Sequence, residues 1–200
     1  MAILERTNNF KIEVEERRIL RLVGYKKKMA EVEPSFLEDI KQEKKKMASL
    51  LQPASIYTII NYEETNRHPI FNKAEKVALC ICTIGPEVER EIEELMQKNE
   101  MLEALILDAL ASEAAEEVAR QSDRILAQKA RELDLWPSKR FSPGYKPWPL
   151  EEQKFIFSMI PAEEIGVKLN PNSWMMVPRK SISFRINFYK DKNLTTRKKF

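Results

Sequence analysis

The segment spanning residues 136–149 places the strongest constraint on how this chain can fold. Its fourteen positions hold four prolines, one glycine, three basic residues and three aromatic residues besides Trp136. Proline has no amide hydrogen and fixes its own backbone angle, so this segment cannot be a helix or an interior strand. Irregular segments of this length in a compact domain tend to be functional. We therefore expect a functional loop here, with a helix restarting after Pro149.

Helical periodicity occupies much of the chain before this loop. Apolar residues recur at helical spacing over residues 34–51 and, in an alanine-rich run, over residues 101–133. Shorter helices are predicted over residues 14–23 and after Gly85-Pro86, because proline suits a first helical turn. The apolar stripes predicted to be buried are Val88, Ile92, Leu95 and Met96 in the helix after Pro86, and Leu102, Leu105, Ile106, Ala109 and Leu110 at the start of the alanine-rich helix.

Three segments have the pattern of β-strands. Residues 56–62 and 77–84 are apolar runs, and the second is predicted to be fully buried. Residues 181–188 alternate polar and apolar side chains, which is typical of a half-buried strand. Because helices and strands mix without a βαβαβ rhythm, we predict an α+β fold with an antiparallel sheet and flanking helices. The sequence has four glycines and no visible linker or repeat, so residues 1–200 are expected to form a single domain.

Cysteine and histidine usage gives no sign of a metal site. Cys80 and Cys82 lie two apart in an apolar run, and this spacing is not that of paired zinc ligands. We interpret both as small buried residues on one face of a strand. His68 is the only histidine and precedes a proline in a polar stretch, so we expect a loop residue there.

The overall composition is that of a soluble protein, with 43% hydrophobic and 32% charged residues. No run approaches the ~18 apolar residues that a membrane helix needs, and the first residues lack the apolar stretch of a signal peptide. We therefore expect a cytoplasmic protein without a membrane partner. The net charge of +3 is too small to imply nucleic-acid binding, so no nucleic-acid partner is expected.

Basic residues form clusters that allow two interpretations. Because acids interrupt them, the clusters are typical of solvated faces. The sharper alternative is a docking surface for an acidic protein. The clusters are Arg17, Arg18, Arg21, Lys26 to Lys28, Lys44 to Lys46, and Arg197 to Lys199.

Familiar enzymatic signatures are missing from the sequence. It contains no G-x-G-x-x-G, so a nucleotide site of the Rossmann type is disfavoured. No P-loop, H-E-x-x-H or G-x-S-x-G occurs either. Independent catalysis is therefore not indicated, and no catalytic residue is assigned.

Glu113 is an unusual residue in the alanine-rich helix. At about 100° per residue it falls among apolar positions on the helical wheel. A carboxylate in that stripe needs a cation or several hydrogen-bond donors, because burying it alone is costly. Two interpretations stay open: Glu113 forms a structural ion pair, or it receives an ammonium group from a ligand.

The loop contains a second candidate binding group around Arg140. Arginine offers a planar fork of donors that suits a carboxylate. Pro143-Gly144 is a turn-forming pair that allows the backbone to approach a ligand, and Tyr145 supplies a flat face and a hydroxyl. An acid, an arginine and an aromatic turn together suit a zwitterionic amino acid joined to a flat base. Arg140 could equally pair with Glu113 or cap a helix.

The run from Arg140 to Tyr145 resembles the R-x-x-P-G-Y signature of the activation domain of cobalamin-dependent methionine synthase. Other pieces agree with that family in the same order, over about residues 77–188, and the N-terminal helical part, residues 1–55, matches more loosely. These pieces are Cys82-Thr83-Ile84-Gly85, the alanine-rich residues 107–118, Ile165-Gly166-Val167-Lys168-Leu169, Ser173-Trp174-Met175-Met176-Val177-Pro178, and Ser181-Ile182-Ser183.

The resemblance implies a twisted antiparallel sheet with flanking helices that binds S-adenosylmethionine and closes over a cobalamin domain. In that family, inactive cob(II)alamin is restored to methylcobalamin with an electron from a carrier protein and a methyl group from S-adenosylmethionine. This chain has no room for cobalamin, folate or homocysteine modules, so it would act as a freestanding reactivation subunit. Its expected partners are a methionine synthase that carries the cobalamin and lacks its own activation domain, and a flavodoxin or ferredoxin.

The resemblance also implies roles for single residues. The residues implied to bind S-adenosylmethionine are Glu113, Arg140, Ser142, Pro143, Gly144 and Tyr145. Arg140 would bind the carboxylate of the ligand and Glu113 its amino group. The loop backbone over residues 142–144 would hold the adenosyl portion, with Tyr145 packed beside it.

The chain departs from the family pattern at two positions, and an aspartate near the start of the family domain has no clear counterpart in this sequence. Lys146 follows the Gly-Tyr pair, where the multidomain enzymes soon have a cysteine or histidine, and Ile186 replaces a tyrosine of the final strand. A family member that has kept the fold and lost the ligand stays open as an alternative, and so do two other functions. One is an activator of another corrinoid methyltransferase. The other is a non-catalytic module that uses the basic N-terminal helices to bind a protein or, with steep salt dependence, a nucleic acid.

Overall fold

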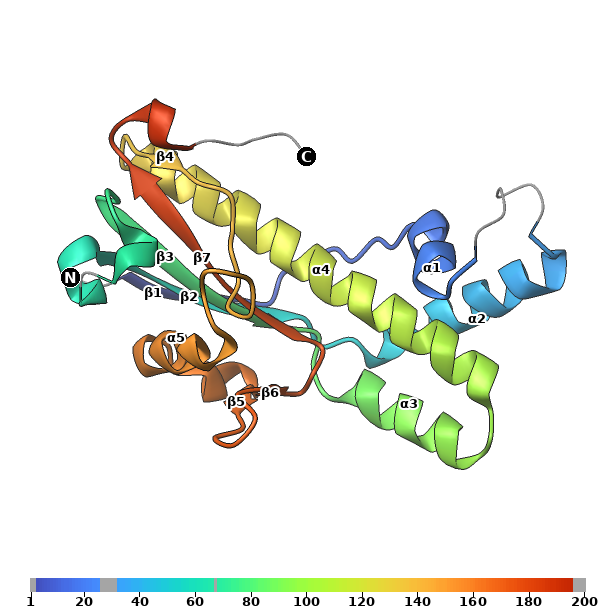
Figure 1. Cartoon of the computed structure of the whole chain (residues 1–200). Helices are drawn as coiled ribbons and strands as arrows, with labels where there is room; N and C mark the ends of the chain where they lie inside the picture. The colour runs from blue at the N-terminus through green and yellow to red at the C-terminus, as the bar shows by residue number, and fades with distance from the viewer. Residues whose placement is uncertain (1–2, 26–31, 67, 196–200) are drawn as a thin grey trace.

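A five-stranded antiparallel sheet forms the centre of the computed structural model, which describes residues 3–25, 32–66 and 68–195 (Figure 1). In spatial order the strands are β1 (Ile3–Thr7), β2 (Ala54–Asn61), β3 (Lys76–Thr83), β7 (Ser181–Tyr189) and β4 (Trp136–Pro137). A separate ribbon pairs β5 (Lys168–Leu169) with β6 (Met176–Val177). The predicted α+β class with an antiparallel sheet and flanking helices is therefore confirmed.

The helices begin and end close to the residues predicted from periodicity. They are α1 (Glu16–Leu22), α2 (Pro34–Leu50), α3 (Glu87–Gln97), α4 (Met101–Glu132) and α5 (Gln153–Met159). Short 3-10 helices cover Tyr62–Thr65, Pro69–Phe71, Leu150–Glu152, Ala162–Ile165 and Lys192–Thr195. Proline opens α2, as its missing amide hydrogen allows at a first helical turn.

Each face of the sheet packs against its own hydrophobic cluster. On β2, Tyr57 and Ile59 point toward α4, whereas Ile56 and Ile60 point toward α5. This alternation follows from the two-residue period of a strand. Because both faces are covered, the central strands β2 and β3 are almost entirely apolar, as expected for strands buried on both sides.

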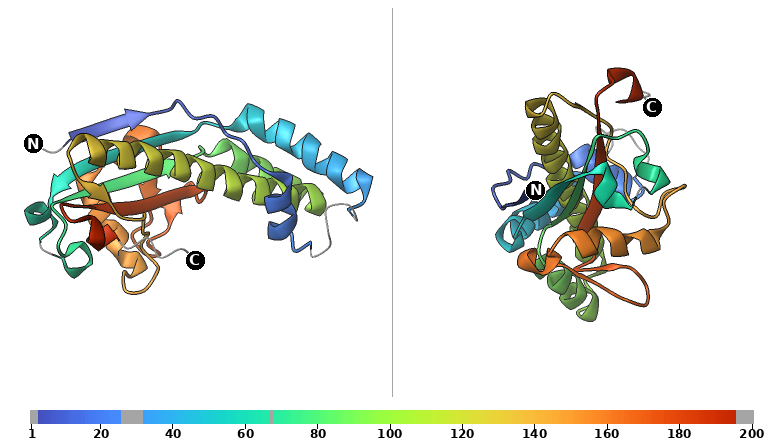
Figure 2. Two further views of the ribbon diagram at one scale, coloured as in Figure 1. Left: turned by 90° about the horizontal axis from the view of Figure 1, so that it is seen from above. Right: turned by 90° about the vertical axis from the view of Figure 1, so that its left-hand side faces the viewer.

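The helical part of the molecule extends beyond the sheet (Figure 2). Helix α4 has 32 residues, which corresponds to about 48 Å at 1.5 Å per residue. Its C-terminal half lies over β7 and β3, and its N-terminal half packs between α2 and α3 (Figure 1). The first turns of α4 therefore have helices, and no sheet, as neighbours.

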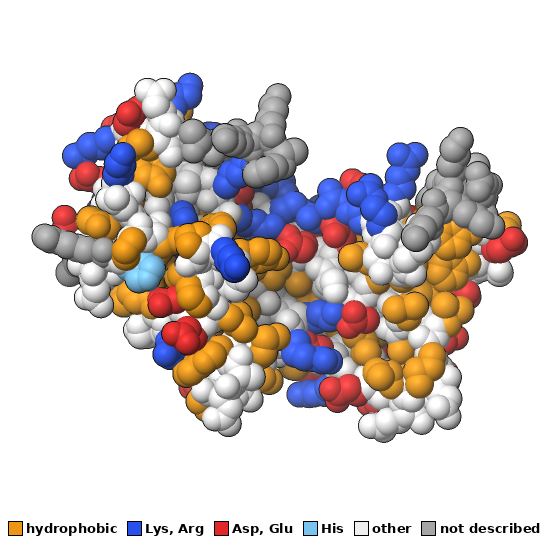
Figure 3. All heavy atoms as spheres, in the orientation of Figure 1, with side chains coloured by type: hydrophobic (Ala, Val, Ile, Leu, Met, Phe, Trp, Pro, Cys, Tyr) orange, Lys and Arg blue, Asp and Glu red, His pale blue; other side chains and the backbone are white. Residues whose placement is uncertain are grey.

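This arrangement corrects part of the predicted buried stripes. Met96, Leu102 and Leu105 are 51%, 44% and 49% exposed, so their predicted burial was wrong. The other predicted stripe residues, Val88, Ile92, Leu95, Ile106, Ala109 and Leu110, are buried. Helical spacing places a residue on a face, but the helical end that projects past the sheet has too few neighbours to cover that face. Figure 3 shows the resulting hydrophobic surface over this end of the molecule.

A tight turn at Gly85 connects β3 to α3. Gly85 has φ +85°, and a Cβ atom built there would lie 2.7 Å from the Cβ of Gln52. The Gln52 amide donates to the Ile84 carbonyl over 2.8 Å, which brings the end of α2 against this turn. Glycine is required here both by the left-handed backbone and by the close approach.

Candidate functional site

The proline-rich loop follows the outer edge of β7 before it leaves the sheet. The Ser138 amide donates to the Asn187 carbonyl over 2.8 Å, and Phe141 exchanges both backbone hydrogen bonds with Arg185, at 3.0 and 2.9 Å. Beyond Phe141 the chain turns away. In the described residues, β7 from Ser181 to Phe184 has no strand partner on this edge, so its backbone groups face the space beside the loop.

A buried tryptophan anchors the turn that follows. The Gly144 amide donates to the Trp148 carbonyl over 2.8 Å, and the Trp148 amide donates to the Tyr145 carbonyl over 2.7 Å. Gly144 has φ +93°, a conformation that L side chains rarely adopt. The Trp148 ring is fully buried and lies parallel to that of Phe141, with 6.4 Å between ring centroids. The turn is thus held by packing as well as by hydrogen bonds.

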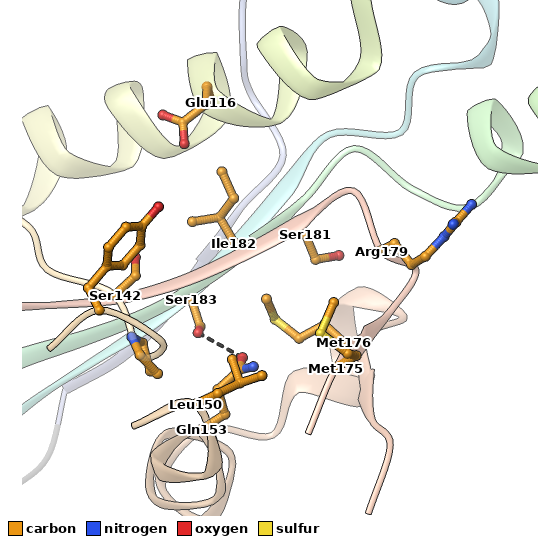
Figure 4. Close-up of a pocket in the computed structure, with 12 residues that line it drawn as sticks. Glu116, Ser142, Leu150, Gln153, Met175, Met176, Arg179, Ser181, Ile182 and Ser183 are labelled. Carbon is orange, nitrogen blue, oxygen red and sulfur yellow. Dashed lines mark hydrogen bonds between the residues drawn. The ribbon is translucent and has the colours of Figure 1, made fainter. Parts of the chain in front are cut away.

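A cavity of about 220 Å³ opens at this edge of β7 (Figure 4). It lies between the loop on one side and β6 on the other, with Glu116 of α4 and Gln153 of α5 also in its lining. The residues that line it are Glu116, Ser142, Pro143, Tyr145, Leu150, Gln153, Met175, Met176, Arg179, Ser181, Ile182 and Ser183.

The lining combines apolar surface with a few fixed polar groups. Leu150, Met175 and Met176 supply the apolar part. The Ser183 hydroxyl donates to Gln153 Oε1 over 2.9 Å, and the side-chain Nε2 of Gln153 donates to the Trp174 carbonyl over 2.6 Å. A mostly apolar concave surface with a small number of oriented polar groups is the usual form of a small-molecule site.

An ion pair joins the loop to α4 at the border of this cavity. Arg140 Nη2 lies 2.5 Å from Glu116 Oε2, and Glu116 projects from α4 toward the cavity (Figure 4). The Arg140 guanidinium also lies over the Phe184 ring, with Cζ 5.8 Å from the ring centroid. One anion and one cation therefore stand side by side at the edge of a half-apolar cavity.

Glu113 lies one turn before Glu116 on α4 and has different partners. Its carboxylate is 2.7 Å from Arg18 Nη1 and 2.6 Å from Arg120 Nη2, and the residue is 8% exposed. The structural ion pair considered from the sequence is therefore present, and it ties α1 to α4. Glu113 does not line the cavity described above.

The two cysteines are buried, and the histidine caps a short 3-10 helix. Burial raises the pKa of both thiols, that of Cys82 to about 12, so both are neutral at physiological pH. His68 precedes a 3-10 helix, where its Nδ1 accepts a hydrogen bond from the Ile70 amide over 3.2 Å. Within residues 3–25, 32–66 and 68–195, no group of three or more His, Cys, Asp or Glu side chains could hold a metal ion.

A solved structure resembles this chain along most of its length. No protein-family model and no curated protein match the sequence. The crystal structure of the MetH reactivation domain bound to AdoHcy matches with a TM-score of 0.68 and 16% sequence identity, over 94% of this chain and 79% of that chain. This chain has the fold of the MetH reactivation domain. The motif resemblance found in the sequence is thereby confirmed at the level of the fold.

Within this reactivation-domain fold, the predicted site residues are only partly brought together. Ser142, Pro143 and Tyr145 line the cavity, and Gly144 forms the turn between them. Arg140 is not among the lining residues but contacts one of them, Glu116. The role predicted for Glu113 stays a prediction.

Several residues of the cavity were not predicted from the sequence. Gln153 comes from α5, Met176 from β6 with Met175 just before it, and Ser181 and Ser183 from β7. The S-x-x-M and S-I-S pieces were visible as motifs, but nothing local showed that they face the loop. Glu116 carries no local signal either, because Glu113 and Glu117 accompany it on the same helix.

The structure shows ion-pair partners for some of the basic residues that cluster in the sequence. Arg18 pairs with Glu113, and Lys46 pairs with Glu91 over 3.1 Å and with Glu43 over 3.5 Å. The clusters Lys26 to Lys28 and Arg197 to Lys199 lie outside the described residues. None of the helices in the described ranges combines the length and apolar character that crossing a bilayer requires.

Proposed function

We propose that this chain binds S-adenosylmethionine and acts as a reactivation module for a separate cobalamin-dependent methionine synthase. The proposal is supported by the fold it shares with the MetH reactivation domain, whose crystal structure contains AdoHcy. It is supported independently by the R-x-x-P-G-Y loop, three residues of which line a cavity.

The ion pair between Arg140 and Glu116 is the observation that carries the proposal. A zwitterionic amino acid has a carboxylate and an ammonium group on one carbon atom. Arg140 would donate to the carboxylate, and Glu116 would accept from the ammonium group. Ligand binding would thus replace the ion pair between Arg140 and Glu116 with two ion pairs between the protein and the ligand. Because both partners exchange charge for charge, neither is left unpaired in the complex.

The remaining part of the site suits the adenosyl portion of the ligand. Met175, Met176 and Leu150 offer apolar surface, and the turn at residues 142–144 brings backbone groups to the cavity. At about 220 Å³ the cavity is smaller than the ~300–1,000 Å³ usual for small-molecule sites. Part of the ligand would therefore lie outside it, against the 68% exposed ring of Tyr145.

The chemistry would take place on a partner protein. Bound S-adenosylmethionine would supply the methyl group that restores methylcobalamin and would leave as S-adenosylhomocysteine. The cobalamin would be held by the methionine synthase, and a flavodoxin or ferredoxin would supply the electron. The residues of this chain would bind and orient the methyl donor, without catalysis of their own.

Isothermal titration calorimetry with S-adenosylmethionine and S-adenosylhomocysteine tests the proposal. We expect both to bind, and Arg140→Ala to weaken them roughly 10- to 100-fold, since a hydrogen bond to a charged group contributes about 1.5–3 kcal/mol. Arg124→Ala is the matched control, because that arginine is exposed and pairs with Glu117, away from the cavity. Absence of binding by the wild type, alone and with a cobalamin-loaded synthase, would contradict the proposal.

The identity of the partner needs a second measurement. Pull-down with the immobilised chain should retain a cobalamin-loaded methionine synthase that lacks an activation domain. Retention of a different corrinoid methyltransferase in its place would redirect the proposed role to that enzyme.

A further inference from the structure

The register between the loop and β7 contains one extra residue. Trp136 is paired with Tyr189 and Pro137 with Phe188, and Ser138 continues this register by bonding to Asn187. The next pair is Phe141 with Arg185. Three steps along the loop thus oppose two steps along β7, which is the definition of a β-bulge, and the extra residue falls at Lys139 or Arg140.

The bulge decides which face of the sheet Arg140 joins. Residues directly opposite each other in an antiparallel pair point to the same face. In an unbroken register Arg140 would stand opposite Arg185 and share its face, the one that packs against α5. Because of the bulge, Phe141 takes that place, and Arg140 points to the α4 face, beside Phe184 and Glu116.

Two cation–π contacts hold this shifted register, one on each face. The Arg185 guanidinium lies over the Phe141 ring, with Cζ 5.2 Å from the ring centroid, and that of Arg140 lies over Phe184 at 5.8 Å. Arg185 therefore contacts Phe141, which follows Arg140 in the chain, and Arg140 contacts Phe184, which precedes Arg185. Both distances fall within the ~6 Å over which a cation is attracted to a ring.

Arg185 has no other charged contact that explains its position. It forms no ion pair within residues 3–25, 32–66 and 68–195, and its buried Nε has no hydrogen-bond partner there. Burial lowers the pKa of its guanidinium below the ordinary value. Arg185 is half-buried, and a partly buried cation without a carboxylate is unfavourable compared with an apolar side chain. The contact with Phe141 is therefore the feature that distinguishes Arg185 from an apolar residue at this place.

We propose that Arg185 is a positioning residue: it holds Phe141 in the bulged register and thereby directs Arg140 toward Glu116 and the cavity. The part that concerns the register stands on geometry alone. The part that concerns ligand affinity rests on the function proposed above.

The register is tested on the free protein by hydrogen exchange. The Phe141 amide donates to the backbone of Arg185, so this bond survives any change of the Arg185 side chain that leaves the register intact. We expect Arg185→Met to accelerate exchange of the Phe141 amide about tenfold or more, and Arg185→Lys to have a smaller effect because it keeps the cation. Arg124→Met serves as the control. The proposal would be overturned if the Phe141 amide exchanges at an unchanged rate in Arg185→Met and a thermal-unfolding transition shows that this variant is folded.

The effect on the ligand is tested by a double-mutant cycle. If Arg185 acts through Arg140, Arg185→Met should weaken S-adenosylmethionine binding about tenfold in the wild-type background and leave it unchanged in an Arg140→Ala background. Equal weakening in both backgrounds would overturn the positioning role. Absence of binding by the wild type would instead remove the proposed function, while the exchange measurement still decides the register.

Discussion

Arg140 and Glu116 form an ion pair across 24 residues of sequence, with Nη2 and Oε2 2.5 Å apart. The pair joins the proline-rich loop to α4 and places opposite charges at the edge of one cavity. The sequence predicted an acid on this helix as the counterpart of the loop arginine but selected Glu113. Residues three apart on a helix differ by about 60° in direction. That rotation separates a carboxylate at the cavity from one that faces Arg18 and Arg120.

The two glutamates should therefore respond differently to the same change. We expect Glu116→Gln to weaken S-adenosylmethionine binding roughly 10- to 100-fold, because it removes the charge that faces the ammonium group. Glu113→Gln should leave affinity nearly unchanged and lower the free energy of unfolding by about 1–3 kcal/mol, since two arginines lose their shared carboxylate. Calorimetric titration and urea unfolding of both variants measure this. Loss of affinity in Glu113→Gln alone would support the ligand-binding role predicted for Glu113 from the sequence.

Gly85 should tolerate no side chain. Gly85→Ala is expected to lower the free energy of unfolding by at least about 2 kcal/mol, because alanine would be strained at φ +85° and its Cβ would meet that of Gln52. Gly24→Ala is the matched control: Gly24 has φ +81°, but no atom of the described residues lies within 4 Å of the added Cβ, so we expect a loss of about 1 kcal/mol. Equal losses for the two variants in urea unfolding would show that the contact with Gln52 contributes nothing.

The exposed start of α4 should accept polar residues. Leu105→Gln is expected to change the free energy of unfolding by no more than about 0.5 kcal/mol, as is usual for surface positions. Leu110→Ala, five residues further on, should cost about 2–5 kcal/mol because that side chain is fully buried. Denaturant unfolding compares the two. A cost above about 2 kcal/mol for Leu105→Gln would mean that its side chain is covered after all.

Glu5 should make the stability depend on pH in the acid range. A hydrogen bond from the Tyr57 hydroxyl and another from Lys129 lower the pKa of Glu5. A lowered pKa in the folded state stabilises the protein above the ordinary glutamate value of about 4.3, and this stabilisation disappears as the pH falls through the folded-state value. Glu5→Gln should therefore be less stable than the wild type at pH 7, and the difference should disappear as the pH falls through the lowered folded-state pKa of Glu5. A difference that is independent of pH would contradict this, and Glu93→Gln, at an exposed glutamate on α3, is the control.

Local residue patterns were sufficient to predict the secondary structure. Helical spacing predicted α2 and α4, and the apolar run around Cys80 predicted a strand buried on both faces. These features depend on backbone geometry and on which side chains avoid water, and both are written in short stretches of sequence. The loop after α4 was also predictable, because its prolines exclude a helix and an interior strand, although its first two residues form the short edge strand β4.

The tertiary structure decided which of these residues meet. Leu105 is exposed because α4 extends beyond the sheet. A helical wheel describes one helix alone and does not show which neighbours cover it. Arg140 points toward Glu116 because one extra residue shifts the register against β7, and pairing registers are set by contacts between distant segments. The sequence by itself thus determined the elements and the kind of groups the loop would offer. Only the packing of α4, β7 and the loop determined which carboxylate those groups face, because that choice depends on a rotation of about 60° and a shift of one residue.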